Sequence, residues 1–154
     1  MSLPRGVPVV GVLVLAGVTL AGCGSAGRPT LEQARAETEA VLQQIADGVP
    51  GGVVEVDTPT PPYLTCGEGE YYATIRWAVT ARPGFDGEAF IDALPGRLGK
   101  EFMVDENVEV KPPGVALDHS GGITLEAKVA ETYRGSVLFL IGLTPCAEGD
   151  PPAE

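Results

Sequence analysis

The sequence is poor in basic side chains. Ten Lys and Arg residues stand against 21 Asp and Glu residues in a chain of 154, which gives a formal net charge of −11. Proteins that bind nucleic acid need a basic surface to replace phosphate counterions, so the composition argues against a nucleic-acid partner. The chain also has one histidine and three cysteines. We therefore expect no transition-metal site, because such sites need several imidazole or thiolate ligands.

Phosphate-binding motifs are also missing. Neither GVPGG at residues 48–52 nor SGG at residues 120–122 has the spacing of a phosphate-binding loop, and no helix-borne lysine follows either of them. We expect no bound cofactor.

The N-terminal apolar run is too short to cross a membrane. Residues 7–20 (VPVVGVLVLAGVTL) form an uncharged stretch of fourteen residues, whereas a spanning helix needs about 20. Arg5 precedes the run, and no basic stop-transfer cluster follows it. This pattern is typical of a secretory signal peptide. We expect residues 1–22 to be removed.

The residues at the expected cleavage site have a distinctive order. Leu20, Ala21 and Gly22 are followed directly by Cys23, which resembles the bacterial lipobox. The resemblance implies that the Cys23 thiol receives a diacylglyceryl group carrying palmitate-type chains and becomes the first residue of the processed protein. Two acyl chains anchor a protein stably, so we expect a location at the extracytoplasmic face of the cell membrane. The alternative is a free or disulfide-bonded cysteine near an ordinary cleavage site.

The segment after Cys23 and the charge of the processed chain both bear on the membrane. Residues 23–29 are rich in Gly and Ser and are expected to form a flexible linker. Removal of residues 1–22 leaves nine basic and 21 acidic residues, and 9 − 21 = −12. This charge should repel the folded domain from anionic headgroups within a Debye length of about 8 Å.

Two further cysteines, Cys66 and Cys146, remain in the processed chain. An exported chain meets an oxidising environment, where an even pair indicates a disulfide. The spacing excludes a local redox or zinc motif of the C-x-x-C kind. The alternative is two buried free thiols.

The first half of the processed chain contains one clear helix and one long strand. Residues 30–48 predict an amphipathic helix, because Thr30 and Gln33 have capping-box spacing and Gly48 supplies a stop. Residues 53–57 predict a short strand with Val54 and Val56 inward, followed by a proline-rich loop over residues 58–66. In that loop Tyr63 either folds back on the domain or contacts a ligand. Residues 71–82 alternate and predict a strand whose core side carries these residues: Tyr71, Ala73, Ile75, Trp77, Val79 and Ala81.

The second half predicts another helix and several strands. Asp86 can cap a helix, which should kink or end near Leu94 because Pro95 lacks a backbone donor. Strands are expected around 108–110, 115–117, 123–129 and 137–143, with a hairpin turn at 131–135. The last strand is apolar on both sides, which is typical of a central strand covered on both faces. Residues 30–146 should form one α+β domain, a two-layer sandwich with two helices on one face of an antiparallel sheet, and residues 147–154 a disordered tail.

Two polar segments contain residue types used in catalysis. His119 lies between Asp118 and Ser120, the residue types of a hydrolytic triad. Adjacent residues of an extended chain point to opposite faces, so a polar turn explains them better. Asp105, Glu106 and Glu109 could bind calcium or act as acid and base, but they lack calcium-loop spacing and favour a solvated turn. We therefore expect no catalytic residue and no metal ligand.

The whole pattern is similar to small actinobacterial cell-envelope lipoproteins of the LppA type. The resemblance rests on the lipobox, a helix ending IADGVPGG, a strand, TC, a long strand ending TARPG, a second helix and a terminal LTPC. It implies an envelope lipoprotein with an α/β sandwich and a Cys66–Cys146 bridge. The family offers no catalytic motif to carry over.

These observations favour a non-catalytic binding or interaction module at the membrane, whose partner is an envelope protein or a small ligand. One alternative is a carrier that holds an apolar ligand between the sheet and the helices, with Trp77, Phe90 and Phe139 lining the cavity. Another is a hydrolase that uses the carboxylates near Asp105.

Overall fold

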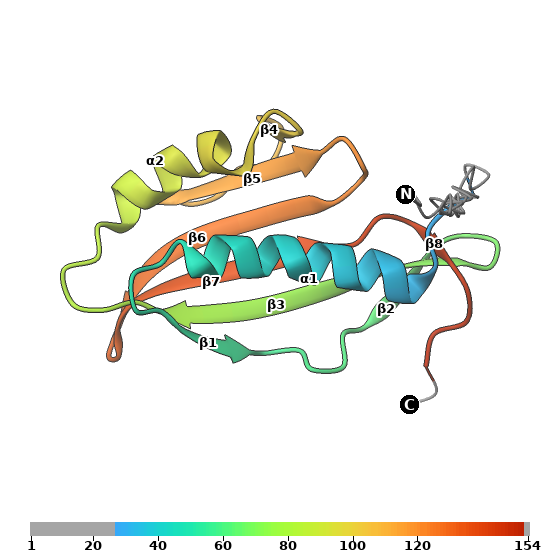
Figure 1. Cartoon of the computed structure of the whole chain (residues 1–154), viewed down its shortest axis with the longest axis horizontal. Helices are drawn as coiled ribbons and strands as arrows, with labels where there is room; N and C mark the ends of the chain where they lie inside the picture. The colour runs from blue at the N-terminus through green and yellow to red at the C-terminus, as the bar shows by residue number, and fades with distance from the viewer. Residues whose placement is uncertain (1–26, 153–154) are drawn as a thin grey trace, which may run out of the picture.

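Two helices lie on the same face of an antiparallel sheet (Figure 1), which confirms the predicted α+β sandwich. The structure is a computed structural model, and it describes residues 27–152. The helices are α1 (Leu31–Asp47) and α2 (Gly87–Leu98). The strands are β1 (Val53–Val56), β2 (Tyr63–Gly67), β3 (Glu70–Thr80), β4 (Phe102–Val104), β5 (Gly114–His119), β6 (Thr124–Thr132), β7 (Gly135–Leu143) and β8 (Ala147–Glu148).

The sheet is organised around β3 and β7. Its strand order is β1-β3-β7-β6-β5-β4, and β2 and β8 pair with the first residues of β3. The second half of β3 pairs with β1 and β7. The predicted hairpin at 131–135 is confirmed, because Thr132 pairs with Gly135 where β6 turns into β7.

Helix α1 begins as the sequence predicts. The Thr30 hydroxyl accepts a hydrogen bond from the Gln33 backbone N–H, and the Gln33 side chain accepts one from the Thr30 N–H. These reciprocal bonds satisfy donors that a helix start leaves without partners. The helix buries a stripe that packs on β3 and β7: Leu31, Ala34, Thr38, Leu42, Ile45 and Ala46.

Helix α2 covers the other half of the same face. It packs on β4, β5 and β6 and buries Phe90, Ile91 and Leu94. Asp86 accepts a hydrogen bond from the Ala89 N–H, as predicted for its cap. The predicted end near Leu94 is wrong, since the helix continues through Pro95 to Leu98; the alternative prediction, a kink, stays a prediction. Proline removes only one backbone donor, and the Phe90–Leu94 face stays packed in the core.

Three predicted segments differ from the structure. Residues 108–110 form no strand, and β4 lies instead at Phe102–Val104, where it pairs with β5. The proline-rich loop is shorter than predicted, because β2 begins at Tyr63. Tyr63 itself packs beside Leu31 and Ala147, which confirms that it folds back on the domain. The predicted tail is wrong at its first two residues: Ala147 is buried and β8 pairs with β3.

Strand β1 exists as predicted, but Val54 and Val56 are not buried. By register they share a face with Val79 and Trp77, which are buried under the helices. Their exposed fractions are nevertheless 37% and 46%. Helix α1 packs on β3 and β7 and leaves this edge strand uncovered.

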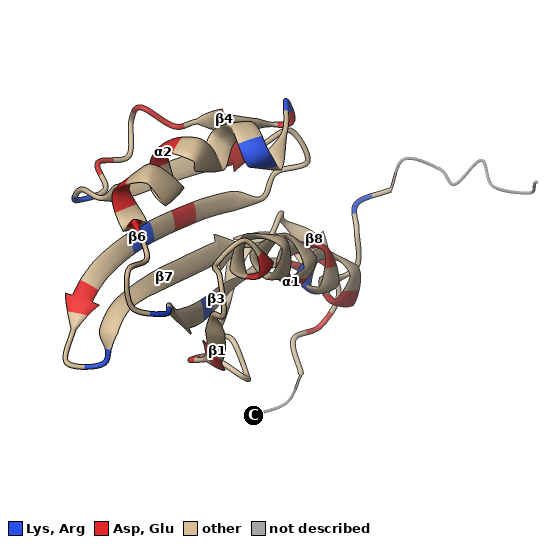
Figure 2. Ribbon diagram, turned by 60° about the vertical axis from the view of Figure 1, so that its left-hand side comes forward, with Lys and Arg blue, Asp and Glu red and all other residues tan. Residues whose placement is uncertain are grey.

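Strand β7 is central, as predicted, but it is not covered on both faces. The helices pack on one side of the sheet only (Figure 2). Leu138 and Leu140 point to the helices and are 0% and 1% exposed, whereas Phe139 points the other way and is 38% exposed. One side of an apolar strand therefore faces solvent.

Candidate functional site

The uncovered side of the sheet carries an apolar stripe along β7, which we call the open face. Side chains alternate along a strand, so the residues opposite to Leu138 and Leu140 share this side: Val137, Phe139, Ile141 and Leu143. Val137 is buried, Ile141 and Leu143 are half-buried, and Phe139 is exposed. The solvated face of an antiparallel sheet ordinarily carries polar residues, so an exposed Phe in the middle of this face is unusual.

Charged residues flank the stripe in a fixed register. Ile141 pairs with Arg76 on β3 and with Glu126 on β6. A cation therefore lies on one side of Ile141 and a carboxylate on the other. Lys128 of β6 pairs with Phe139. Among residues 27–152, the ion pairs within 4.0 Å involve other residues and leave these three charges unpaired.

These residues surround a shallow surface depression of about 370 Å³. Its lining on the open face comprises Asp57, Arg76, Glu126, Lys128, Phe139 and Ile141. Acidic residues outnumber basic ones along the chain (Figure 2), whereas the lining of this depression combines two cations, two carboxylates and two apolar residues on the open face.

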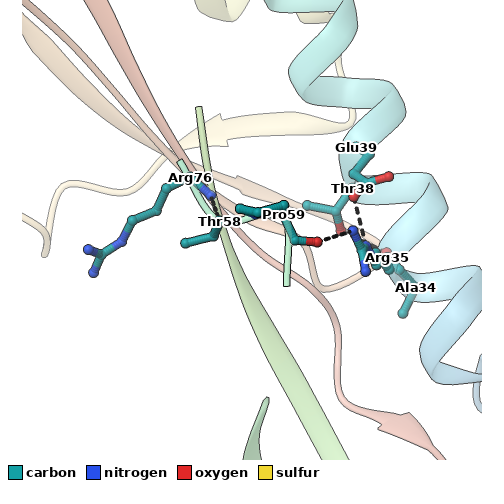
Figure 3. A network of polar contacts seen from close by, with 7 residues as sticks. All are labelled: Ala34, Arg35, Thr38, Glu39, Thr58, Pro59 and Arg76. Atoms are coloured by element: carbon teal, nitrogen blue, oxygen red, sulfur yellow. Dashed lines mark hydrogen bonds and ion pairs between the residues drawn. The ribbon is translucent and has the colours of Figure 1, made fainter. Parts of the chain in front are cut away.

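Polar contacts fix the β1 side of the depression. The Asp57 N–H donates to the Arg76 carbonyl at 2.9 Å, and the Arg76 N–H donates to the Thr58 hydroxyl at 2.8 Å. The next residue, Pro59, accepts a hydrogen bond from the Arg35 guanidinium at 3.1 Å. Figure 3 shows the Arg76 side chain pointing away from α1, on the far side of these contacts. Hydrogen bonds therefore fix the backbone of Arg76, while its guanidinium has no ion-pair partner within the described chain.

Arg35 ties the same segment to α1. Its guanidinium donates to Glu39 at 2.8 Å, one helical turn along. This hydrogen bond is the main reason that the pKa of Arg35 is raised above its ordinary value. In the same turn of α1, the buried Thr38 hydroxyl donates a hydrogen bond to the Ala34 carbonyl (Figure 3).

A second arginine is paired at the hairpin between β6 and β7. The Arg134 guanidinium donates a hydrogen bond to Glu55 of β1, which raises the pKa of Arg134 above its ordinary value.

The predicted cysteine sites divide into one that is confirmed and one that is not described. Cys66 and Cys146 form a disulfide with their Cα atoms 6.2 Å apart. It joins β2 to the residue before β8, the two strands that flank the start of β3. Cys23, the predicted lipidation site, lies outside the described residues.

A metal site finds little support in the described part of the chain. The one group of three potential ligands found among these residues is Cys66, Glu70 and Cys146. Its two sulfur atoms are joined in the disulfide, so neither is available as a thiolate.

The polar segment at 117–122 is a turn only in its second half: β5 continues to His119, and residues 120–123 connect it to β6. His119 Nδ1 accepts a hydrogen bond from the Gly121 N–H, and Nε2 lies 3.3 Å from a Glu101 oxygen. Asp118 accepts a hydrogen bond from the Thr124 hydroxyl instead of contacting the imidazole. The residue types of a triad are present, but their side chains are engaged with different neighbours.

The carboxylates at 105–109 also form the predicted solvated turn. Asp105 accepts hydrogen bonds from the backbone and side-chain N–H groups of Asn107, at 2.9 and 3.0 Å. Glu106 and Glu109 are exposed. No cleft brings the three carboxyl groups together among the pockets found in the described chain.

The three aromatic residues predicted to line a carrier cavity do not share one. Trp77 and Phe90 are 7% and 4% exposed and fill the core between helices and sheet. Phe139 lies on the opposite side of the sheet. Trp77 Nε1 is buried without a hydrogen-bond partner in the described chain, whereas a buried indole N–H ordinarily has one.

The sequence contained a signal for the open face that the prediction misinterpreted. Strand β7 is apolar on both sides, while its neighbour β6 alternates Leu125, Ala127 and Val129 with Glu126 and Lys128. Polar residues on this side of β6 indicate a solvent-facing side, from which partial exposure of the apolar residues beside them on β7 could have been predicted; the prediction instead took β7 to be covered on both faces.

Among the described residues, no helix has both the length and the apolar character needed to cross a bilayer. Comparison of the chain with protein-family models, with curated proteins and with solved structures finds no match in any of the three. The resemblance to small actinobacterial lipoproteins therefore stays a prediction.

Proposed function

We propose that the protein is a lipid-anchored, extracytoplasmic interaction module without catalytic activity, and that it binds its partner on the open face. The observation that carries this proposal is the uncovered side of β7. Phe139 is 38% exposed there, beside the unpaired charges of Arg76 and Glu126. Exposed apolar surface rimmed by polar residues marks interaction sites in soluble proteins.

The start of the described chain supports an anchor at one end of the molecule. Arg28 forms an ion pair with Glu70, and the Pro29 carbonyl accepts a hydrogen bond from the Glu148 N–H at 3.0 Å. These contacts hold the chain against β8, at the end where α1 begins (Figure 1). Cys23 precedes Gly27 by four residues, a reach of at most about 14 Å. A lipid on Cys23 would keep this end next to the bilayer.

The proposed orientation leaves the open face accessible. The long strands β3, β6 and β7 run along the longest axis of the molecule, away from the anchored end (Figure 1). The open face would then stand upright on the membrane instead of lying on it. This arrangement suits a partner that is also held at the membrane.

Photocrosslinking in membranes of cells that process lipoproteins tests the proposed surface. A photoreactive phenylalanine analogue replaces Phe139 in one variant and the exposed Glu37 of α1 in a control. We expect a discrete crosslinked product from position 139 that is weak or missing from position 37. Equal crosslinking at both positions, or none at position 139 in membrane-bound protein, would contradict the proposal.

A further inference from the structure

We propose that the open face binds a second copy of this chain, with the two sheets packed face to face about a two-fold axis along β7. This inference goes beyond the proposed module by naming its partner, and one of its arguments rests on the proposed anchor. Sheets that pack in this way lie about 10 Å apart with their side chains interdigitated.

The charges that flank Ile141 are complementary to each other under this rotation. Arg76 and Glu126 stand on opposite sides of Ile141, in one row across three strands. A two-fold axis along β7, between the sheets, exchanges the two sides of the row. Arg76 of each copy then lies over Glu126 of the other. One symmetric contact therefore pairs two cations and two carboxylates that have no ion-pair partner within the described chain.

The apolar stripe lies on the proposed axis. Residues on a two-fold axis meet their own counterparts, so Phe139 and Ile141 of one copy would pack on the same residues of the other. This contact would cover the side of β7 that the helices leave open. Central apolar residues inside a rim of opposite charges are the usual anatomy of a specific interface.

A two-fold axis across the strands does not fit as well. If it passed through Ile141, it would place Arg76 over Arg76 of the second copy and Glu126 over Glu126. Like charges in direct opposition cost several kcal/mol. The register of the row therefore selects the axis along β7.

The proposed anchor selects the same axis. The start of the described chain lies at one end of the long strands, because Arg28 pairs with Glu70, the first residue of β3. The Pro29 carbonyl accepts a hydrogen bond from Glu148 of β8 at the same end. A rotation about an axis along those strands leaves both copies with this end pointing the same way, so both lipids could enter one bilayer. A rotation about an axis across the strands would point the two anchored ends in opposite directions. Confinement to one membrane also raises the effective concentration of the two copies.

Charge-swap variants of the membrane-bound protein test the inference. Ile141→Cys reports contact on the axis through a short bifunctional thiol crosslinker, because sheets about 10 Å apart hold the two cysteines close together but too far apart for a direct disulfide. Arg76→Glu or Glu126→Arg in this background should reduce the crosslinked product at least about tenfold, since each introduces two like-charge contacts. Lys100→Glu, at an exposed turn outside the open face, is the matched control and should change nothing.

Two combinations of these charge reversals should restore the proposed ion pairs between the copies. The double variant Arg76→Glu/Glu126→Arg should recover the crosslink. So should co-expression of the two single variants, because a mixed pair places opposite charges over each other at both positions. Loss of the product in the single variants without recovery in either combination would overturn the inference in favour of another partner. An Ile141→Cys variant that gives no crosslinked dimer, or a crosslink that neither charge reversal reduces, would also overturn it. Sedimentation of the same samples with membranes reports on the anchor separately.

Discussion

Phe139 and Leu140 are neighbours on β7 with opposite environments. Leu140 is 1% exposed and packs in the core beneath the helices, whereas Phe139 is 38% exposed on the open face. The difference follows from the alternation of side chains along a strand and from the placement of both helices on one side. Leu140 therefore contributes mainly to stability, and Phe139 is available for binding.

Truncation of these two residues should separate the roles. We expect Leu140→Ala to lower the free energy of unfolding by about 2–5 kcal/mol, because it removes buried methyl groups and leaves a cavity. Phe139→Ala should cost about 1 kcal/mol or less in the monomer, since its ring is already partly hydrated. Denaturant unfolding of both variants, compared with the unchanged chain, measures the difference. Equal losses would show that the assignment of faces is wrong.

Removal of the Cys66–Cys146 disulfide should destabilise the domain strongly. The bridge spans a sequence separation of 80, and the chain-entropy model assigns about 4–5 kcal/mol to closing a loop of that length. The double variant Cys66→Ala/Cys146→Ala should therefore unfold at a much lower denaturant concentration. The unchanged protein in reductant is the control and should approach the same midpoint. A midpoint that neither treatment shifts would count against this role.

Two glycines should respond to alanine in opposite directions. A Cβ at Gly142 would lie 2.7 Å from the Thr38 methyl group, where α1 crosses β7. Thr38 is buried and its hydroxyl donates to Ala34, so it is not free to move aside. We expect Gly142→Ala to lower the free energy of unfolding by about 1–3 kcal/mol.

Gly96 lies inside α2, and a Cβ there would meet nothing within 4 Å. Gly96→Ala should therefore raise the free energy of unfolding by about 0.5–1 kcal/mol, the ordinary gain of alanine over glycine in a helix. Thermal or denaturant unfolding of the two variants side by side checks both signs. The packing of α1 on β7 would be contradicted if Gly142→Ala were as harmless as Gly96→Ala.

The long periodic elements could be predicted from the sequence. Helix α1 follows from its capping box and apolar stripe, and β3 from an alternation that Ala78 interrupts. The two-layer architecture and the disulfide also agree with the predictions. In each case, many residues or a strong chemical constraint pointed to the same structure.

The shortest strands, and the solvent exposure of individual apolar side chains, could not be predicted from sequence periodicity. Strands β4 and β8 have three and two residues, too few for periodicity, and they exist because a partner strand offers hydrogen bonds. The exposure of Val54 and Phe139 depends on how far the two helices reach across the sheet. A single strand does not encode that distance, so the open face emerged only from the assembled layers.

Mass spectrometry of the protein purified from membranes of cells that process lipoproteins tests the central proposal most directly. The account predicts a chain that begins at Cys23 and carries the added mass of a diacylglyceryl group on that residue, with Cys23→Ala lost from the membrane fraction. A membrane-bound protein that retains residues 1–22 and an unmodified Cys23 would contradict it.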